Sequence, residues 1–80
     1  MSGGMLWQLS DLKKKPLAEQ VQTAVEYFTR KYQVQPVGIQ GSRKSFKGET
    51  AVGVHIIVPD ETIMKNHLLL QFPDGYVGER

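Results

Sequence analysis

The chain has no cysteine, so neither disulfides nor thiolate-ligated metal sites contribute to its fold. It also lacks a long hydrophobic run, since its apolar stretches are only a few residues long and a bilayer span needs roughly 20. No charged segment followed by an apolar core indicates a signal peptide. We therefore expect a cytoplasmic protein without membrane contact.

A strong charge of one sign is absent as well. Ten Lys and Arg residues against eight Asp and Glu residues give a net charge of +2. This excess is too mild to indicate nucleic-acid binding by itself, because nucleic-acid-binding domains concentrate basic residues on one face. Eighty residues, 40% of them hydrophobic, are typical of one small globular domain. We expect that domain to span residues 5–77, between a flexible start at 1–4 and a tail at 78–80.

One segment has clear helical periodicity, from about Pro16 to Tyr32. Proline is favoured at the first helical position, where its missing N–H would be unpaired anyway. Apolar residues then recur at offsets of 4, 3, 1, 3 and 4 and share one face of a helix. They are Leu17, Val21, Ala24, Val25, Phe28 and Tyr32. The pattern predicts one amphipathic helix.

Four shorter segments have strand character, with glycine and proline between them indicating loops and turns. They are residues 6–9, 37–40, 50–58 and 68–72. We expect the second and third to form a hairpin through the long loop 41–49. The sequence therefore predicts an α+β fold, in which one amphipathic helix packs on a mostly antiparallel sheet of three to four strands.

The run from Ala51 to Val58 is apolar on both faces of the predicted strand. By the two-residue period, its even-numbered residues 52–58 share one face, which we assign to the helix. His55 and Ile57 then lie on the other face, together with Leu69 of the last strand and Trp7 of the first. A single helix cannot cover these apolar residues as well.

Three interpretations of this second face remain open. Trp7 or Tyr76–Val77 could fold across it, a symmetric dimer could bury two such faces or pair two edge strands, or the face could bind another molecule. The candidate partner-binding or dimer residues are Trp7, His55, Ile57 and Leu69. We expect a homodimer or a protein partner.

Two basic clusters are candidate anion or nucleic-acid sites. Lys13, Lys14 and Lys15 precede the helix, where positive charge opposes the helix dipole but can join free backbone N–H groups in binding phosphate. The loop residues Arg43, Lys44, Phe46 and Lys47 combine positive charge with an aromatic ring that could stack on a base. The plainer interpretations are a solvated connector and a loop whose Phe46 packs on the sheet edge.

No pattern of catalytic residues is present. His55 and His67, with Asp60 and Glu61 between them, lack a compact metal-ligand spacing, and no nucleophile motif surrounds Ser42 or Ser45. We expect a protein that is not an enzyme and that uses no cofactor and no metal.

Three segments carry a resemblance: AVEYFTRKY at 24–32, VQPVGI at 34–39 and NHLL at 66–69. In these the chain resembles small uncharacterised α+β proteins of bacteria and mobile elements, which implies a fold but no activity. The function we expect is a small interaction module, a homodimer or a binder of a protein partner through a sheet face or edge. The alternative is a nucleic-acid-binding protein that uses Lys13–Lys15 and the Arg43–Lys47 loop.

Overall fold

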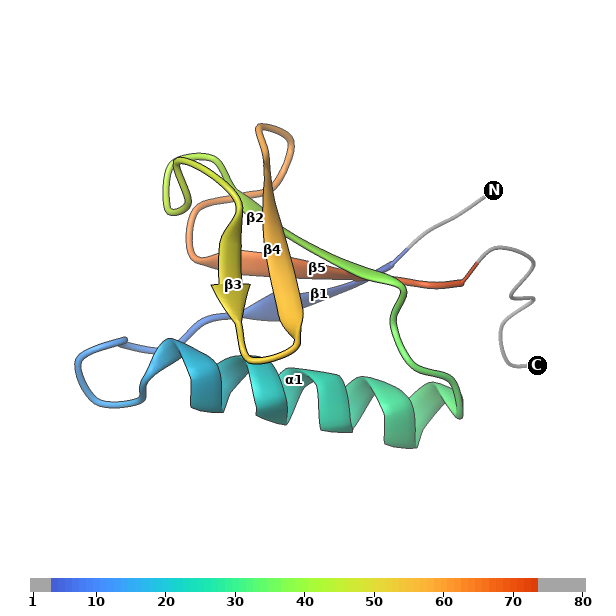
Figure 1. Ribbon diagram of the computed structural model, residues 1–80. Helices are drawn as coiled ribbons and strands as arrows, with labels where there is room; N and C mark the ends of the chain where they lie inside the picture. The colour runs from blue at the N-terminus through green and yellow to red at the C-terminus, as the bar shows by residue number, and fades with distance from the viewer. Residues whose placement is uncertain (1–3, 74–80) are drawn as a thin grey trace.

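The computed structural model describes residues 4–73, which form one helix and a five-stranded sheet. In chain order the elements are β1 (Gly4–Gln8), α1 (Leu17–Tyr32), β2 (Gly38–Ser42), β3 (Thr50–Val52), β4 (His55–Asp60) and β5 (His67–Gln71). The helix lies along one side of the sheet (Figure 1). The predicted α+β fold is confirmed, with one strand more than expected.

The strand order is β1-β5-β2-β4-β3, with β2 in the centre. The β2–β4 pairing is parallel, and the other three pairings are antiparallel. Because β1 and β2 both run antiparallel to β5, which lies between them, α1 connects two strands of the same direction. The sheet is strongly twisted, so that β3 and β4 cross in front of β1 and β5 in Figure 1.

The helix begins and ends close to the predicted residues. Pro16 precedes it in an extended conformation, and Gln33 ends it with a φ of 64° and an N–H that donates to the Thr29 carbonyl at 2.8 Å. A residue in the left-handed conformation is common at the C-terminal end of a helix. The proline at position 36 is therefore not what stops the helix.

Gln20 is a buried polar residue on the helix face that packs against the rest of the chain. Its side-chain oxygen accepts a hydrogen bond from the Ser10 N–H at 2.6 Å, and its amide donates to the Lys15 carbonyl at 2.9 Å. A weaker bond to the Ser10 carbonyl, at 3.3 Å, completes the set. Gln20 thus fixes the connector between β1 and α1.

The predicted strand 50–58 is two strands, β3 and β4, joined by a two-residue turn at Gly53 and Val54. Gly53 has a φ of +62°, which suits the first central position of a type II′ hairpin turn. Our expectation of a hairpin between 37–40 and 50–58 is wrong for the same reason. The chain reverses once more at Gly53, so β4 returns parallel to β2.

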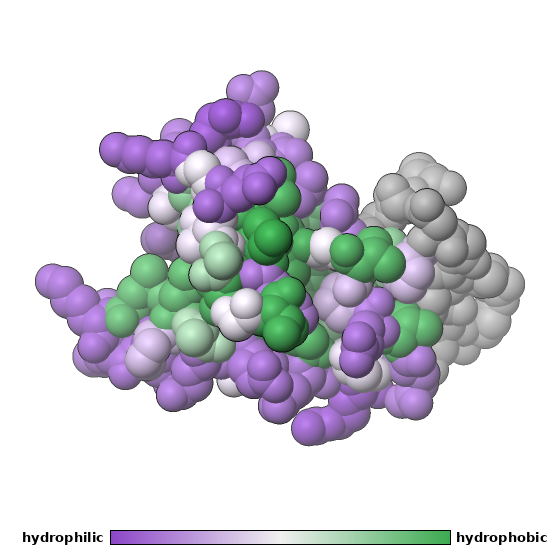
Figure 2. All heavy atoms as spheres, in the orientation of Figure 1, coloured by the Kyte–Doolittle hydropathy of each residue, from purple (hydrophilic) through white to green (hydrophobic). Residues whose placement is uncertain are grey.

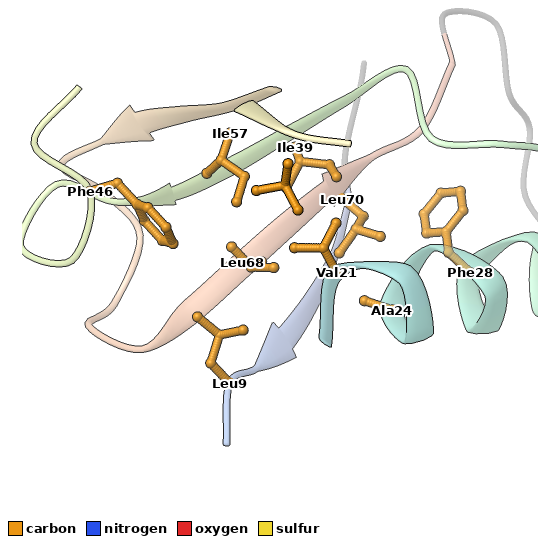
Figure 3. Packing of buried hydrophobic residues seen from close by; sticks show 10 residues of the cluster. Leu9, Val21, Ala24, Phe28, Ile39, Phe46, Ile57, Leu68 and Leu70 are labelled. Carbon is orange, nitrogen blue, oxygen red and sulfur yellow. The ribbon is translucent and has the colours of Figure 1, made fainter. Parts of the chain in front are cut away.

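The core lies between α1 and the sheet (Figure 3). Its largest fully buried apolar side chains are Phe28, Ile57, Leu68, Leu70 and Val21. Phe28 also contacts the Tyr32 ring, with the ring centroids 4.9 Å apart. The predicted helical face is therefore the face that packs.

Our assignment of the faces of strand 50–58 is correct for Val52, which is buried on the helix side, and wrong for the residues after Gly53. Ile57 is fully buried in the core, whereas Ile56 and Val58 are 53% and 41% exposed on the opposite side of the sheet. The two-residue period does not continue through the turn, because Gly53 and Val54 belong to neither strand. Val52 and His55 pair across the turn and so lie on the same side of the sheet. Odd-numbered residues of β4 therefore face the core, and Ile57 pairs with the buried Ile39 of β2.

Two expectations concern the ends of the chain. Gly4 is the first residue of β1 rather than part of a flexible start, while residues 1–3 and the predicted tail at 78–80 lie outside the described residues. Within the part of the chain that is described, no helix has the length and apolar character to cross a membrane.

Candidate functional site

The candidate site is the side of the sheet opposite α1, which we call the open face. Strand register aligns four of its residues in a row across β1, β5, β2 and β4: Leu6 beside Leu69, Leu69 beside Gln40, and Gln40 beside Val58. Ile56 lies on the same side of β4, and Ala51 of β3 is its cross-strand partner. None of these six residues is charged.

Large apolar side chains of the open face are exposed within the described residues. Leu6 is 51% and Ile56 is 53% exposed, and Val54 at the hairpin turn is almost fully exposed. Figure 2 shows hydrophobic side chains gathered over β4 and its turn, between hydrophilic groups on the loops above and along α1 below. A contiguous apolar patch with a polar rim is typical of an interaction surface.

A shallow hollow of about 360 Å³ opens on this face. Its apolar lining comes from Val37, Val54, Ile56 and Val58, which lie on and beside β4. Polar groups in the lining include the residues Gln40, Gln71 and His55. The hollow therefore offers apolar contact and amide hydrogen bonds to whatever covers it.

Gly38 shapes one side of the hollow. A Cβ at this position would lie 2.6 Å from the side-chain oxygen of Gln71, its cross-strand neighbour in β5. The missing side chain thus lets the Gln71 amide lie across β2. Gln71 lies at the end of its strand, so its amide borders the face rather than occupying its centre.

Asp60 marks the charged border of the open face, at the end of β4. The Thr62 hydroxyl and the Thr62 N–H both donate to Asp60 Oδ1, at 2.5 Å and 2.8 Å. These two bonds, the hydroxyl first, lower the pKa of the Asp60 carboxyl, partial burial opposes them, and the positive charge of Arg43 adds a smaller lowering. Asp60 therefore carries a negative charge at neutral pH.

The four candidate partner residues do not lie together. Leu69 is half-buried on the open face, as expected. His55 is the cross-strand partner of buried Val52 and so lies on the helix side of β4, which corrects our expectation. Ile57 lies in the core, so no partner can contact it. Trp7 packs on the helix side, with its ring centroid 5.5 Å from that of Tyr27, and so does not close the open face. The residues Tyr76–Val77 lie outside the described part.

The two basic clusters lie apart. In Figure 1 the connector that carries Lys13–Lys15 lies beside the start of α1, while the β2–β3 loop lies across the sheet from it. Phe46 of that loop is buried in the core, so its ring is not available to stack on a base. Arg43, Lys44 and Lys47 are exposed. Nucleic-acid binding stays a prediction, in which Phe46 can take no part.

The histidines do not form a metal centre with acidic neighbours. Among residues 4–73, no group of three His, Cys, Asp or Glu side chains is close enough to hold a metal ion. His67 Nδ1 lies 2.9 Å from the Lys65 carbonyl, which accounts for one of its ring nitrogens.

Sequence reasoning missed Ile56, Val58 and Gln40 as residues of the exposed surface. The signal that could have found Ile56 and Val58 is Gly53, because a glycine before a valine can form a two-residue hairpin turn and reset the period. Gln40 could have been noticed as the polar residue in a predicted strand whose neighbours are apolar.

Comparisons of the chain with family models, with curated proteins and with solved structures give no match.

Proposed function

We propose that the protein is a non-enzymatic interaction module that forms a reversible homodimer through its open face. The observation that carries this proposal is the uncharged row Leu6, Leu69, Gln40 and Val58, extended by exposed Ile56. Covering such a surface removes apolar area from water, which is the main driving force of protein association.

The charge distribution favours a second copy as the occupant. The chain has eighteen charged residues (ten basic and eight acidic), yet none stands in the row or at Ile56 and Ala51. Two copies of a charged row would repel each other, whereas two copies of this uncharged row do not. Charge depletion is also typical of interface centres.

The size of the face sets the strength that we expect. Five strands about 4.8 Å apart and about five residues long give the face roughly 400 Å² in projection. Stable complexes bury about 800 Å² per partner, so this contact is small. The strong twist of the sheet limits flat contact further. We therefore expect a dimer that dissociates in the micromolar range rather than an obligate one.

The proposal is tested by size-exclusion chromatography with light scattering over a dilution series. Wild type is expected to fall from twice the monomer mass of 9.0 kDa toward the monomer mass as concentration falls. Ile56→Lys is expected to weaken association by about 100-fold, because each dimer would bury two unpaired ammonium groups.

Met64→Lys is the matched control. Met64 is 57% exposed, similar to Ile56, but lies in the turn between β4 and β5. This variant is expected to associate like wild type. A monomeric wild type at high concentration contradicts the proposal. A dimer that persists in Ile56→Lys also contradicts it, and would place the contact elsewhere, for example at the β1 edge.

A further inference from the structure

We infer that the two copies pack open face to open face with Gln40 on the two-fold axis, each Gln40 amide paired with the same amide of the second copy. The inference rests on the proposed homodimer and goes further, because it names the residue that fixes how the copies align. It follows from the position of Gln40, from its chemistry and from symmetry.

Gln40 is at the centre of the open face in both directions. It is the middle residue of β2, and β2 is the middle strand of the sheet. On its two sides lie Leu69 and Val58, its register partners in β5 and β4. The one polar member of the row therefore has an apolar side chain on each side within the row, while along β2 the Gln71 amide lies across Gly38.

The side-chain amide of Gln40 has unused hydrogen-bonding capacity. Its oxygen accepts and its nitrogen donates, and no hydrogen bond from residues 4–73 engages either atom. Gln40 is half-buried, so it still reaches water in the monomer. A covering surface that removed this water without offering both a donor and an acceptor would leave the amide unpaired, which opposes binding.

An identical amide satisfies this requirement, because a carboxamide is complementary to itself. In a closed two-fold dimer, residues on the axis meet their own copies, while a residue away from the axis meets a different one. Placing Gln40 on the axis thus satisfies both amides at once and centres the two apolar rows on each other. A single polar residue in an apolar contact fixes alignment in the same way in coiled coils.

The experiment uses opposite charges at this position. Gln40→Glu and Gln40→Lys are each expected to be monomeric where wild type is a dimer, because each homodimer would place two like charges together. Their equimolar mixture is expected to form a one-to-one heterodimer, identified by native mass spectrometry. Raising the salt concentration from about 0.05 M to about 0.5 M is expected to weaken this heterodimer by less than about tenfold, because a charge pair enclosed in the contact is screened less than an exposed one.

Gln22 provides the matched control, since it is the same residue type on the exposed side of α1. Gln22→Glu and Gln22→Lys are each expected to dimerise alone like wild type. Circular dichroism checks that all four variants keep the fold. A second measurement uses the absence of cysteine: Gln40→Cys is expected to be joined into a covalent dimer by a short bismaleimide, and Gln22→Cys is not.

The outcomes separate this inference from the proposed function. If wild type dimerises but the charged Gln40 variants also dimerise alone, or their mixture stays monomeric, Gln40 is not on the axis and the inference fails while the homodimer stands. A monomeric wild type overturns both.

Discussion

At the scale of single residues, the packing of the core depends on Gly41, which has no side chain. Phe46 leaves its loop and packs over Gly41 of β2, beside Ile57. A Cβ at Gly41 would lie 2.5 Å and 2.7 Å from carbons of the Phe46 ring and 2.9 Å from Ile57 Cγ2. These distances are shorter than van der Waals contact, and both neighbours are buried. The glycine is what allows the loop to be anchored by its aromatic ring.

Gly41→Ala is therefore expected to destabilise the fold by about 1–3 kcal/mol, the usual cost of overpacking a core. The measurement is the urea midpoint of unfolding. Gly48→Ala is the control, because a Cβ there meets no atom within 4 Å, and it is expected to change stability by less than about 1 kcal/mol. Equal midpoints for Gly41→Ala and wild type would show that the Phe46 packing is not as tight as described.

At the scale of elements, the β3–β4 hairpin decides which side chains face outward. Its turn at Gly53 puts Ile57 in the core and leaves Ile56 and Val58 on the open face. A turn one residue longer or shorter would exchange the two sets, since neighbouring strand residues point to opposite faces. The composition of the open face thus depends on the conformation of one glycine.

We expect Gly53→Ala to lower stability by about 1–2 kcal/mol, because an L side chain at positive φ is strained. Gly53→Asn is expected to lose less, since asparagine tolerates such turns better. Thermal unfolding followed by circular dichroism compares the three proteins. If alanine and asparagine proved equally tolerated, the turn would not depend on a positive φ at this position.

The turn after β4 is expected to respond to pH through Asp60. Because Thr62 lowers the pKa of the Asp60 carboxyl in the folded state, this group stabilises the fold above its ordinary pKa of 3.8 and loses that contribution as pH falls below it, through the lowered value. Asp60→Asn is therefore expected to be less stable than wild type at pH 7. The difference should shrink when unfolding is measured at progressively lower pH, below 3.8.

Glu61→Gln removes the same charge from the neighbouring residue, which makes no hydrogen bond to Thr62 among the described residues. Its difference from wild type is expected to be small at every pH. If Asp60→Asn and wild type differed by the same amount at pH 7 and at pH 3, the carboxylate would not be the stabilising group.

The elements differ in how far the sequence could predict them. The helix was predictable because six apolar residues at offsets of 4, 3, 1, 3 and 4 share one face, and β5 because the short apolar run at 68–72 is followed by a proline. The hairpin was not, since the alternation of Val52, Val54, Ile56 and Val58 continues through a turn. Local patterns also carry no information on strand order, so the parallel β2–β4 pairing was not predictable.

An exposed apolar face of the sheet away from the helix was predictable from the sequence, but only some of its residues were. Leu69 was assigned correctly to the face away from the helix. Ile57 and Trp7 were assigned to it as well, but one is in the core and the other packs against Tyr27. For Phe46, packing on the sheet was one of two interpretations that the sequence left open, and the structure buries its ring in the space at Gly41, five residues earlier.

At the scale of the whole molecule, α1 covers one side of the sheet and no described residue covers the other. The helix side supplies the core, with Phe28, Ile57, Leu68 and Leu70 fully buried. The open face keeps an uncharged row with a polar residue at its centre. A second copy that presents the same row would cover this face and meet its central amide with an identical one.

The most direct test of this account is an isotope-filtered NMR experiment on a mixture of labelled and unlabelled copies at high concentration. We expect intermolecular contacts from the methyl groups of Leu6, Ile56 and Val58, and none from Ile63 or Met64 in the β4–β5 turn. The absence of intermolecular contacts, or contacts confined to α1 and the loops, would contradict a homodimer formed through the open face.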